Sequence, residues 1–160
     1  MGDAGGFAES PDARVRDLVP GRPRSYLQLS WHLANVVDAF LEHESGIRLE
    51  HDAYNRIPPG HFTVADVTAY IADVRKRFAD WWRATGAKRD WTEAANVYYG
   101  GVTVHEFLER TTWHSGQHTR QLVWLLKEKL GIDAARPLGP DMWVGLPIPE
   151  QVWDGEKEVR

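Results

Sequence analysis

The chain has 160 residues, of which 42% are hydrophobic and 26% are charged, and this balance is typical of one globular domain that can bury its own core. The formal net charge is −4 and no segment is strongly basic, which argues against nucleic acid as a partner because phosphate contacts need clustered Lys and Arg. The sequence contains no cysteine, which excludes disulfides, thiolate zinc sites and cysteine nucleophiles.

The N-terminal region is polar, with scattered glycine and proline, and contains no signal-peptide core. No apolar run in the chain approaches the length that a membrane span requires, so we expect a cytoplasmic protein that has no membrane partner. Residues 1–10 are predicted to be disordered. Asp12–Val19 is predicted to form a short helix that ends at Pro20.

The first long helix is predicted to begin after Ser25, which forms a capping box with Gln28, and to end at Gly46. Its apolar positions recur at helical spacing and predict a buried stripe that consists of Leu29, Leu33, Val36 and Phe40. Residues 46–62 contain two prolines and several Gly or Asn breakers, and they are predicted to form a loop.

The second long helix is predicted to run from Thr63, which forms a capping box with Asp66, to about Ala84, before Gly86. Its predicted buried stripe consists of Val67, Ile71, Val74, Phe78 and Trp82. Residues 86–102 are predicted to be a long connection that is briefly extended at Val97-Tyr98-Tyr99.

The third long helix is predicted to begin after Thr103, with Glu106 completing its capping box, and to end at Gly131. Residues 132–160 contain four prolines but are too apolar to stay free, so this tail is predicted to pack on the helices. The whole pattern predicts one all-α domain over residues 1–160.

His114 and His118 lie four residues apart in the third helix, so their Cβ atoms should be roughly 5–6 Å apart on one face and can hold one metal ion. By itself this spacing arises by chance in many helices. The pair, however, shares the apolar face with Phe107, Thr111, Leu122 and Leu125. Gly116 stands between the two histidines at a cost of about 1 kcal/mol relative to alanine, which indicates close packing there.

His32 lies on the inward stripe of the first helix, where a bundle can bring it to the pair. A lone inward histidine is more often a hydrogen-bonded core residue, but the three together favour a metal site. Residues 115–117 are Ser, Gly and Gln, so the carboxylate base of His-Glu-x-x-His proteases is missing and we reject that function. Three neutral imidazoles suit zinc, nickel, iron(II) or copper(II), and they leave positions open as catalytic sites do.

The segment Leu108–Leu122 resembles the metal-binding helix of the DinB/YfiT-like superfamily, and Trp31-His32-Leu33 resembles the helix that supplies that family's first histidine. Residues 145–154 are similar to the closing segment of one DinB branch, so the resemblance covers most of residues 24–154. It implies a four-helix bundle with one divalent metal ion, zinc or nickel before iron, on His32, His114 and His118. It also implies a transferase or isomerase that uses a thiol such as mycothiol or bacillithiol.

Two features depart from the family pattern. The N-terminal helix is short or degraded, because only Asp12–Val19 can supply it. An alignment on Trp113-His-Ser-Gly-Gln117 would also place Arg110 at the first position of the histidine pair. We favour His114 and His118, because both are histidines at the proper spacing.

Five further residues are candidates for substrate binding: Tyr98, Tyr99, Arg110, Gln117 and Gln121. Arg110 can hold a carboxylate of substrate or thiol, and the alternative is a surface ion pair with Glu106. The two glutamines can orient the histidines or be solvated. The two tyrosines can close the pocket with a hydroxyl or simply pack.

The remaining histidines are not expected to bind the same ion. His43 lies on nearly the same face as His32 but roughly 16 Å away along the helix axis. His51, His61 and His105 are expected to be solvated. Trp31 and Trp113 are predicted to point off the ligand face, into the core or an interface.

Three functions stay open at this point. The first is a metal-dependent transferase or isomerase that acts on a small molecule; its thiol must be a cosubstrate because the chain has no cysteine. The second is a non-catalytic bundle that binds a small molecule or partner, and the third is a metal-dependent hydrolase or lyase that uses no thiol. A homodimer is expected if the thin N-terminal region leaves an apolar face uncovered.

Overall fold

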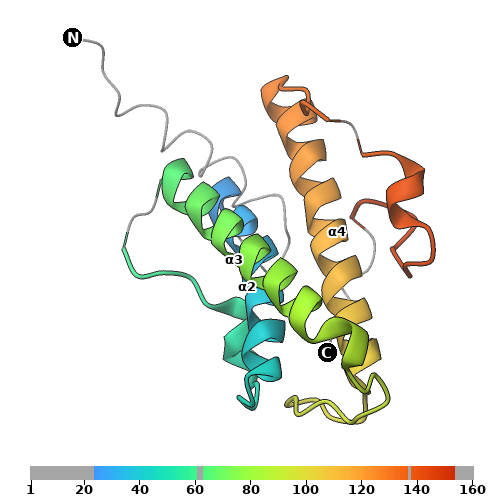
Figure 1. The fold of residues 1–160 in the computed structure, drawn as a ribbon. Coiled ribbons are helices and arrows are strands. Elements are labelled where there is room, and N and C mark those ends of the chain that lie inside the picture. The colour runs from blue at the N-terminus through green and yellow to red at the C-terminus, as the bar shows by residue number, and fades with distance from the viewer. Residues whose placement is uncertain (1–23, 61–62, 137, 154–160) are drawn as a thin grey trace.

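A computed structural model describes residues 24–60, 63–136 and 138–153 of the chain. These residues contain no strand, and they form three α-helices: α2 (Tyr26–Glu44), α3 (Val64–Ala84) and α4 (Val104–Leu130) (Figure 1). The predicted all-α class is therefore confirmed. The predicted helix Asp12–Val19 and the predicted disorder of residues 1–10 lie outside the described residues, so a bundle of four helices stays a prediction.

Each helix begins at the capping box that its sequence predicts. At α2 the Ser25 hydroxyl accepts from the Gln28 N–H, and the Gln28 side chain accepts from the Ser25 N–H. Thr63 caps α3 with Asp66, and Thr103 caps α4 with Glu106, in the same way. These reciprocal bonds satisfy backbone N–H groups that the first helical turn leaves unpaired. The end of α4 is also as predicted, because Gly131 adopts φ 67° in the left-handed region.

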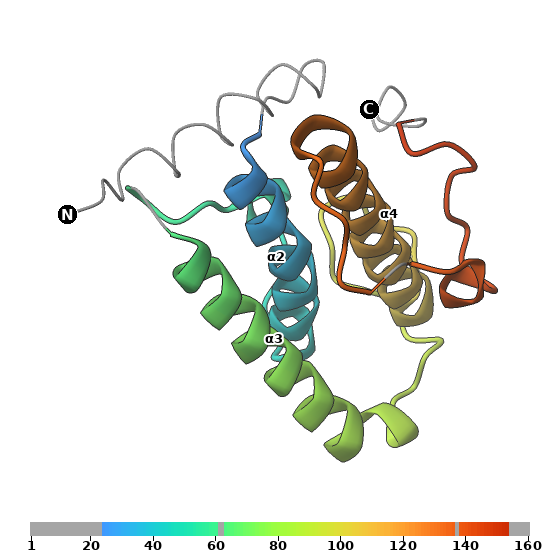
Figure 2. The same cartoon turned by 90° about the horizontal axis from the view of Figure 1, so that it is seen from above.

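The helix α2 is the centre of the fold, because it contacts both α3 and α4 (Figure 2). Its predicted stripe faces these neighbours, with Leu29, Val36 and Phe40 buried and Leu33 half-buried. Phe40 is fully buried and lies within 5.3 Å, ring centre to ring centre, of Phe107 on α4. The arrangement places one face of α2 directly opposite the inward face of α4.

The helix α3 buries less than its sequence predicts. Val67 and Val74 are buried and Phe78 is half-buried, but Ile71 is 39% exposed and Trp82 is 49% exposed. The predicted inward position of these last two residues is wrong. In the described part of the chain α3 packs mainly on α2, so only part of its apolar stripe is covered.

The first connection, which joins α2 to α3, meets the second connection, which joins α3 to α4. Leu49 pairs with Val97 in an isolated parallel bridge, and Tyr98 donates its N–H to the Leu49 carbonyl at 2.9 Å. The predicted extension over Val97-Tyr98-Tyr99 is thus found at Val97 alone, because Tyr98 and Tyr99 form a turn. The predicted loop 46–62 also contains a short 3-10 helix, η1 (His51–Asn55), which the bridge holds next to the tyrosines of the second connection.

The tail runs back along α4 (Figure 1). A second 3-10 helix, η2 (Gly86–Lys88), follows α3, and a third, η3 (Pro140–Trp143), lies in the tail. Trp153 lies against Trp124 with ring centres 5.5 Å apart. Over the part of the chain that the structure describes, none of the helices has the length and apolar character needed to cross a membrane.

Candidate metal centre

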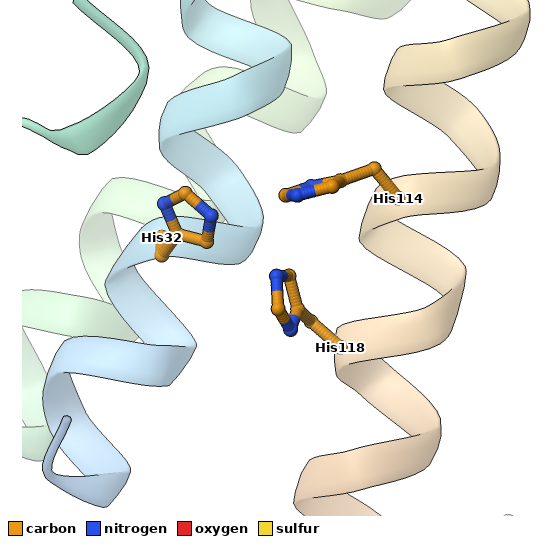
Figure 3. Close-up of side chains that lie close together, drawn as sticks. All are labelled: His32, His114 and His118. Atoms are coloured by element: carbon orange, nitrogen blue, oxygen red, sulfur yellow. The ribbon is translucent and has the colours of Figure 1, made fainter. Parts of the chain in front are cut away.

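Three histidine side chains converge between α2 and α4. His32 comes from α2, and His114 and His118 come from successive turns of α4 (Figure 3). One ring nitrogen from each histidine can be chosen so that all three lie within 4.8 Å of one another. The ring centres are 5.2 Å apart for His32 and His114, 5.1 Å for His32 and His118, and 4.5 Å for the α4 pair. This spacing is compatible with three nitrogen ligands around one ion.

The close packing that Gly116 indicates is found on the outer side of α4. A Cβ atom at this position would lie 2.7 Å from Cζ3 of Trp143 and 3.2 Å from Cδ1 of Ile148. Both contacts come from the tail, so glycine lets residues 143–148 approach the helix backbone between the two histidines. The histidines themselves point the other way, toward α2 (Figure 3).

Burial keeps His32 in the form that binds metal. His32 and His118 are each 6% exposed, and His114 is half-buried. The pKa of His32 lies far below its usual value, mainly because burial disfavours the charged ring and further because the positive charge of Arg24 lies nearby. A neutral imidazole keeps a lone pair, which is what a metal ligand must offer.

A hydrogen bond orients the ring of His118. His118 Nδ1 lies 2.6 Å from Gln121 Oε1, and the Gln121 amide nitrogen donates to the Val152 carbonyl at 3.0 Å. An amide oxygen can only accept, so Nδ1 of His118 carries the proton and Nε2 keeps its lone pair. The backbone of Tyr54 lies near the His32 ring and partly offsets the lowering of its pKa.

The donor set fits a nitrogen-binding divalent metal. Among the described residues, no carboxylate or further histidine joins the group of three. An ion held there would have three protein ligands and would keep positions open for water or substrate, as in catalytic rather than structural sites. The role of the three histidines as ligands remains a prediction.

A cavity of about 100 Å³ lies next to this group. Its walls come from α2, η1, the second connection and α4, and they consist of His32, Val36, His51, Tyr54, Asn55, Tyr98, Tyr99, Phe107, Arg110, Thr111, Trp113 and His114. Three of the five predicted substrate-binding residues are therefore part of it: Tyr98, Tyr99 and Arg110. The Arg110 guanidinium lies over the Tyr99 ring at 5.2 Å from its centre. The alternative pairing of Arg110 with Glu106 is not formed, because the Glu106 carboxylate accepts from Thr103.

The two glutamines do not line the cavity. Gln121 orients His118, as described above. Gln117 is buried and donates to the carbonyls of Gln151 and Val152, so it holds the tail rather than a histidine. The predicted role of orienting a histidine therefore fits Gln121. The side chain of Gln117 is buried, and its amide group donates to the tail rather than to a histidine ring.

Several wall residues were not foreseen from the sequence. Trp113 lines the cavity with its ring centre 6.0 Å from that of His114, so its predicted direction away from the ligand face is wrong. Its long indole reaches around the helix, which a count by helical periodicity ignores. Tyr54 and Asn55 had no signal in the sequence, because the Leu49–Val97 bridge and packing on α2, both between distant segments, bring η1 to this place.

The other histidines lie apart from the group of three. His43 is buried and accepts from the Asn96 N–H at 2.9 Å, so it is a core residue that holds the second connection. His105 is exposed, as predicted. His51 is exposed too, but it also lines the cavity. The prediction for His61 lies outside the described residues.

Comparison with known proteins adds one match. A family model described as the DinB superfamily matches residues 7–122, which is more than half of the chain. The matched range contains all three converging histidines and ends before the tail. Neither the search of curated proteins nor the search of solved structures found a significant match.

Proposed function

The chain belongs to the DinB superfamily, and from this premise we propose that it is a metal-dependent enzyme that uses a low-molecular-weight thiol of the mycothiol or bacillithiol type. The reaction is a transfer or isomerisation on a small electrophile. The observation that carries the proposal is the group of three inward-facing histidines, two of them buried and one half-buried, beside a cavity. The thiol is a cosubstrate, because the chain has no cysteine of its own.

The proposed metal is one divalent ion, zinc or nickel before iron, on His32, His114 and His118. Imidazole nitrogen binds all three metals, so the identity of the ion is determined by metal analysis rather than by the types of ligand. When bound, such an ion binds the sulfur of a thiol, lowers its pKa and so supplies a thiolate at neutral pH.

The chain's own residues hold and shield this site. Gln121 keeps the proton of His118 on Nδ1, so that Nε2 faces the other two histidines. Tyr54 and Tyr99 are half-buried and form aromatic walls that exclude water from one side of the cavity. Arg110 is the cation that can orient an anionic group there.

The cavity also bears on the choice between thiol chemistry and hydrolysis. None of the described residues that line it is acidic, so the carboxylate base that many hydrolases use to activate water is missing from its walls. Turnover without any added thiol would favour a hydrolase or lyase instead. Absence of turnover together with absence of bound metal would favour a non-catalytic binding protein.

Metal analysis of the purified protein tests the proposal. We expect about one ion per chain in the wild type and a large loss in His114→Ala/His118→Ala. The matched control is His105→Ala, which removes an exposed histidine of the same helix and should leave the metal content unchanged. Equally little metal in the wild type and the double variant would overturn the proposal. The second step is to assay the loaded protein with and without thiol.

A small-molecule substrate, a homodimer and a cytoplasmic location remain predictions. The DinB superfamily also supports a bundle of four helices, of which the described residues contain three. Size-exclusion chromatography with light scattering tests the predicted dimer.

A further inference from the structure

We propose that the cavity beside the three histidines binds a small carboxylate, with Arg110 as the charged partner and with the hydroxyls of Tyr54 and Tyr99 as additional donors. This inference rests on the proposed function, since it names the class of molecule that reaches the metal. It goes further because it assigns the anionic group to particular side chains of this chain.

Arg110 has the position that such a role requires. It projects from α4 one turn before His114, and it lines the same cavity as His114 and His32. Its guanidinium contacts the face of Tyr99, which limits its freedom and leaves its N–H groups available. No ion pair joins Arg110 to a carboxylate in the part of the chain that the structure describes. A planar guanidinium that has no acidic partner is suited to bind a carboxylate through two parallel hydrogen bonds.

Two tyrosine hydroxyls add donors on the same side. The hydroxyl oxygens of Tyr54 and Tyr99 are buried near each other, and neither has a well-formed hydrogen bond with the residues described. A buried hydroxyl in this situation lacks a favourable contact that a ligand can supply. A phenol keeps its proton at neutral pH, so both hydroxyls can donate to an anion.

The charge of the cavity points to an anion. The chain as a whole has a net charge of −4, yet none of the described wall residues is acidic. Arg24 adds a second positive charge nearby, because its guanidinium donates to the side chain of the wall residue Asn55 at 3.0 Å. A positive cavity with low-dielectric aromatic walls attracts a small anion and disfavours a cation.

The size of the cavity limits the ligand. Its volume of about 100 Å³ is smaller than the roughly 150 Å³ that accommodates benzene, so the bound part has only a few heavy atoms. The carboxylate end of crotonate, an unsaturated carboxylate with four carbons, meets this limit. Its amide, crotonamide, has nearly the same shape but no charge, so the pair isolates the contribution of the carboxylate.

The test is titration of the zinc-loaded full chain with crotonate and with crotonamide, followed by calorimetry or ligand-observed NMR. We expect crotonate to bind at least tenfold more tightly than crotonamide, because a charge-assisted hydrogen bond contributes about twice as much as a neutral one. Arg110→Gln should weaken crotonate about tenfold to a hundredfold and leave crotonamide unchanged. Tyr99→Phe should weaken crotonate several-fold.

The matched control is Arg75→Gln, which removes the same charge from an exposed position on α3 outside the cavity walls. It should leave crotonate binding unchanged. Equal affinity of the wild type and Arg110→Gln for crotonate would overturn the proposal, since a carboxylate that binds only to zinc would not depend on Arg110. Equal affinity for crotonate and crotonamide would overturn it too, and that comparison needs no variant.

Two further measurements separate this inference from the proposed function. Zinc content is measured for every sample, so a failed carboxylate test in a fully loaded protein contradicts the cavity assignment alone. If the wild type holds no zinc, the proposed function fails, and the same titration of the unloaded chain still tests Arg110. A comparison of N-acetylcysteine with N-acetylcysteamine, which lacks the carboxylate, then shows whether the thiol or the electrophile supplies the anionic group.

Discussion

Gln121 links His118, a predicted metal ligand, to the tail. Its replacement tests whether this link orients the His118 ring for metal binding. The side chain is 1% exposed, accepts from His118 Nδ1 and donates to the Val152 carbonyl. Gln121→Met keeps the approximate shape of the side chain and removes both hydrogen bonds. We expect the affinity for zinc or cobalt to fall about 10- to 100-fold, which corresponds to about 1.4–2.7 kcal/mol.

The magnitude follows from what His118 loses. Without an acceptor at Nδ1, the ring is free to rotate or to change tautomer, and either change moves the lone pair of Nε2 away from the other histidines. Gln121→Glu restores an acceptor at the same position but offers no donor to Val152. It should therefore recover most of the metal affinity while the unfolding free energy stays about 1–3 kcal/mol below that of the wild type.

The assay is competition with a chromophoric chelator, combined with the visible absorption of the cobalt-loaded protein, which reports ligand geometry. The matched control is Gln117→Met. Gln117 is buried one turn earlier and bonds to the same part of the tail, but the structure places no histidine on its amide. If Gln117→Met weakens metal binding as much as Gln121→Met, the effect comes from loss of the tail and the orienting role of Gln121 is refuted. Unchanged affinity in Gln121→Met would refute it as well.

Three further outcomes are expected. Addition of EDTA to the metal-loaded protein should lower the melting temperature, because an ion at 100 times its Kd stabilises the fold by about 2.7 kcal/mol, and His114→Ala/His118→Ala should show no such change. Gly116→Ala should leave the unfolding free energy within about 1 kcal/mol of the wild type, because the gain in helix propensity offsets the steric clash of the new Cβ atom with Trp143. Amide hydrogen exchange should nonetheless become faster in residues 143–148. Unchanged exchange would contradict the close approach of these residues to α4. The pKa of Tyr70 is raised, by burial and then by its hydrogen bond to Asp38, so this residue contributes stability that is lost as pH rises above about 10. Urea unfolding above that pH should therefore show a shallower loss of stability in Tyr70→Phe than in the wild type, and identical slopes would exclude this contribution.

The helix boundaries could be predicted because their causes are local. The capping boxes at Ser25, Thr63 and Thr103 depend on side chains only three residues away from the backbone groups that they satisfy. The pairing of His114 and His118 is equally local, because four residues bring a helix back to the same face. Such features follow from the order of residues, whatever the helix packs against.

The exposure of α3 could not be predicted in this way. Ile71 and Trp82 fall on the same helical stripe as Val67, yet they are exposed in the described structure. Whether an apolar stripe is covered depends on the position and angle of the neighbouring helix, and those are set by packing across the whole domain.

For the site, the sequence by itself determined that two histidines of one helix face inward with no carboxylate between them. It suggested His32 as their partner mainly through resemblance to a family. Only the tertiary structure decided that α2 brings His32 within 4.8 Å of that pair, that Trp113 turns toward the cavity, and that Tyr54 closes its wall. The physical reason is that these contacts join segments far apart in the chain, through helix packing and the Leu49–Val97 bridge, and no local periodicity encodes such pairings.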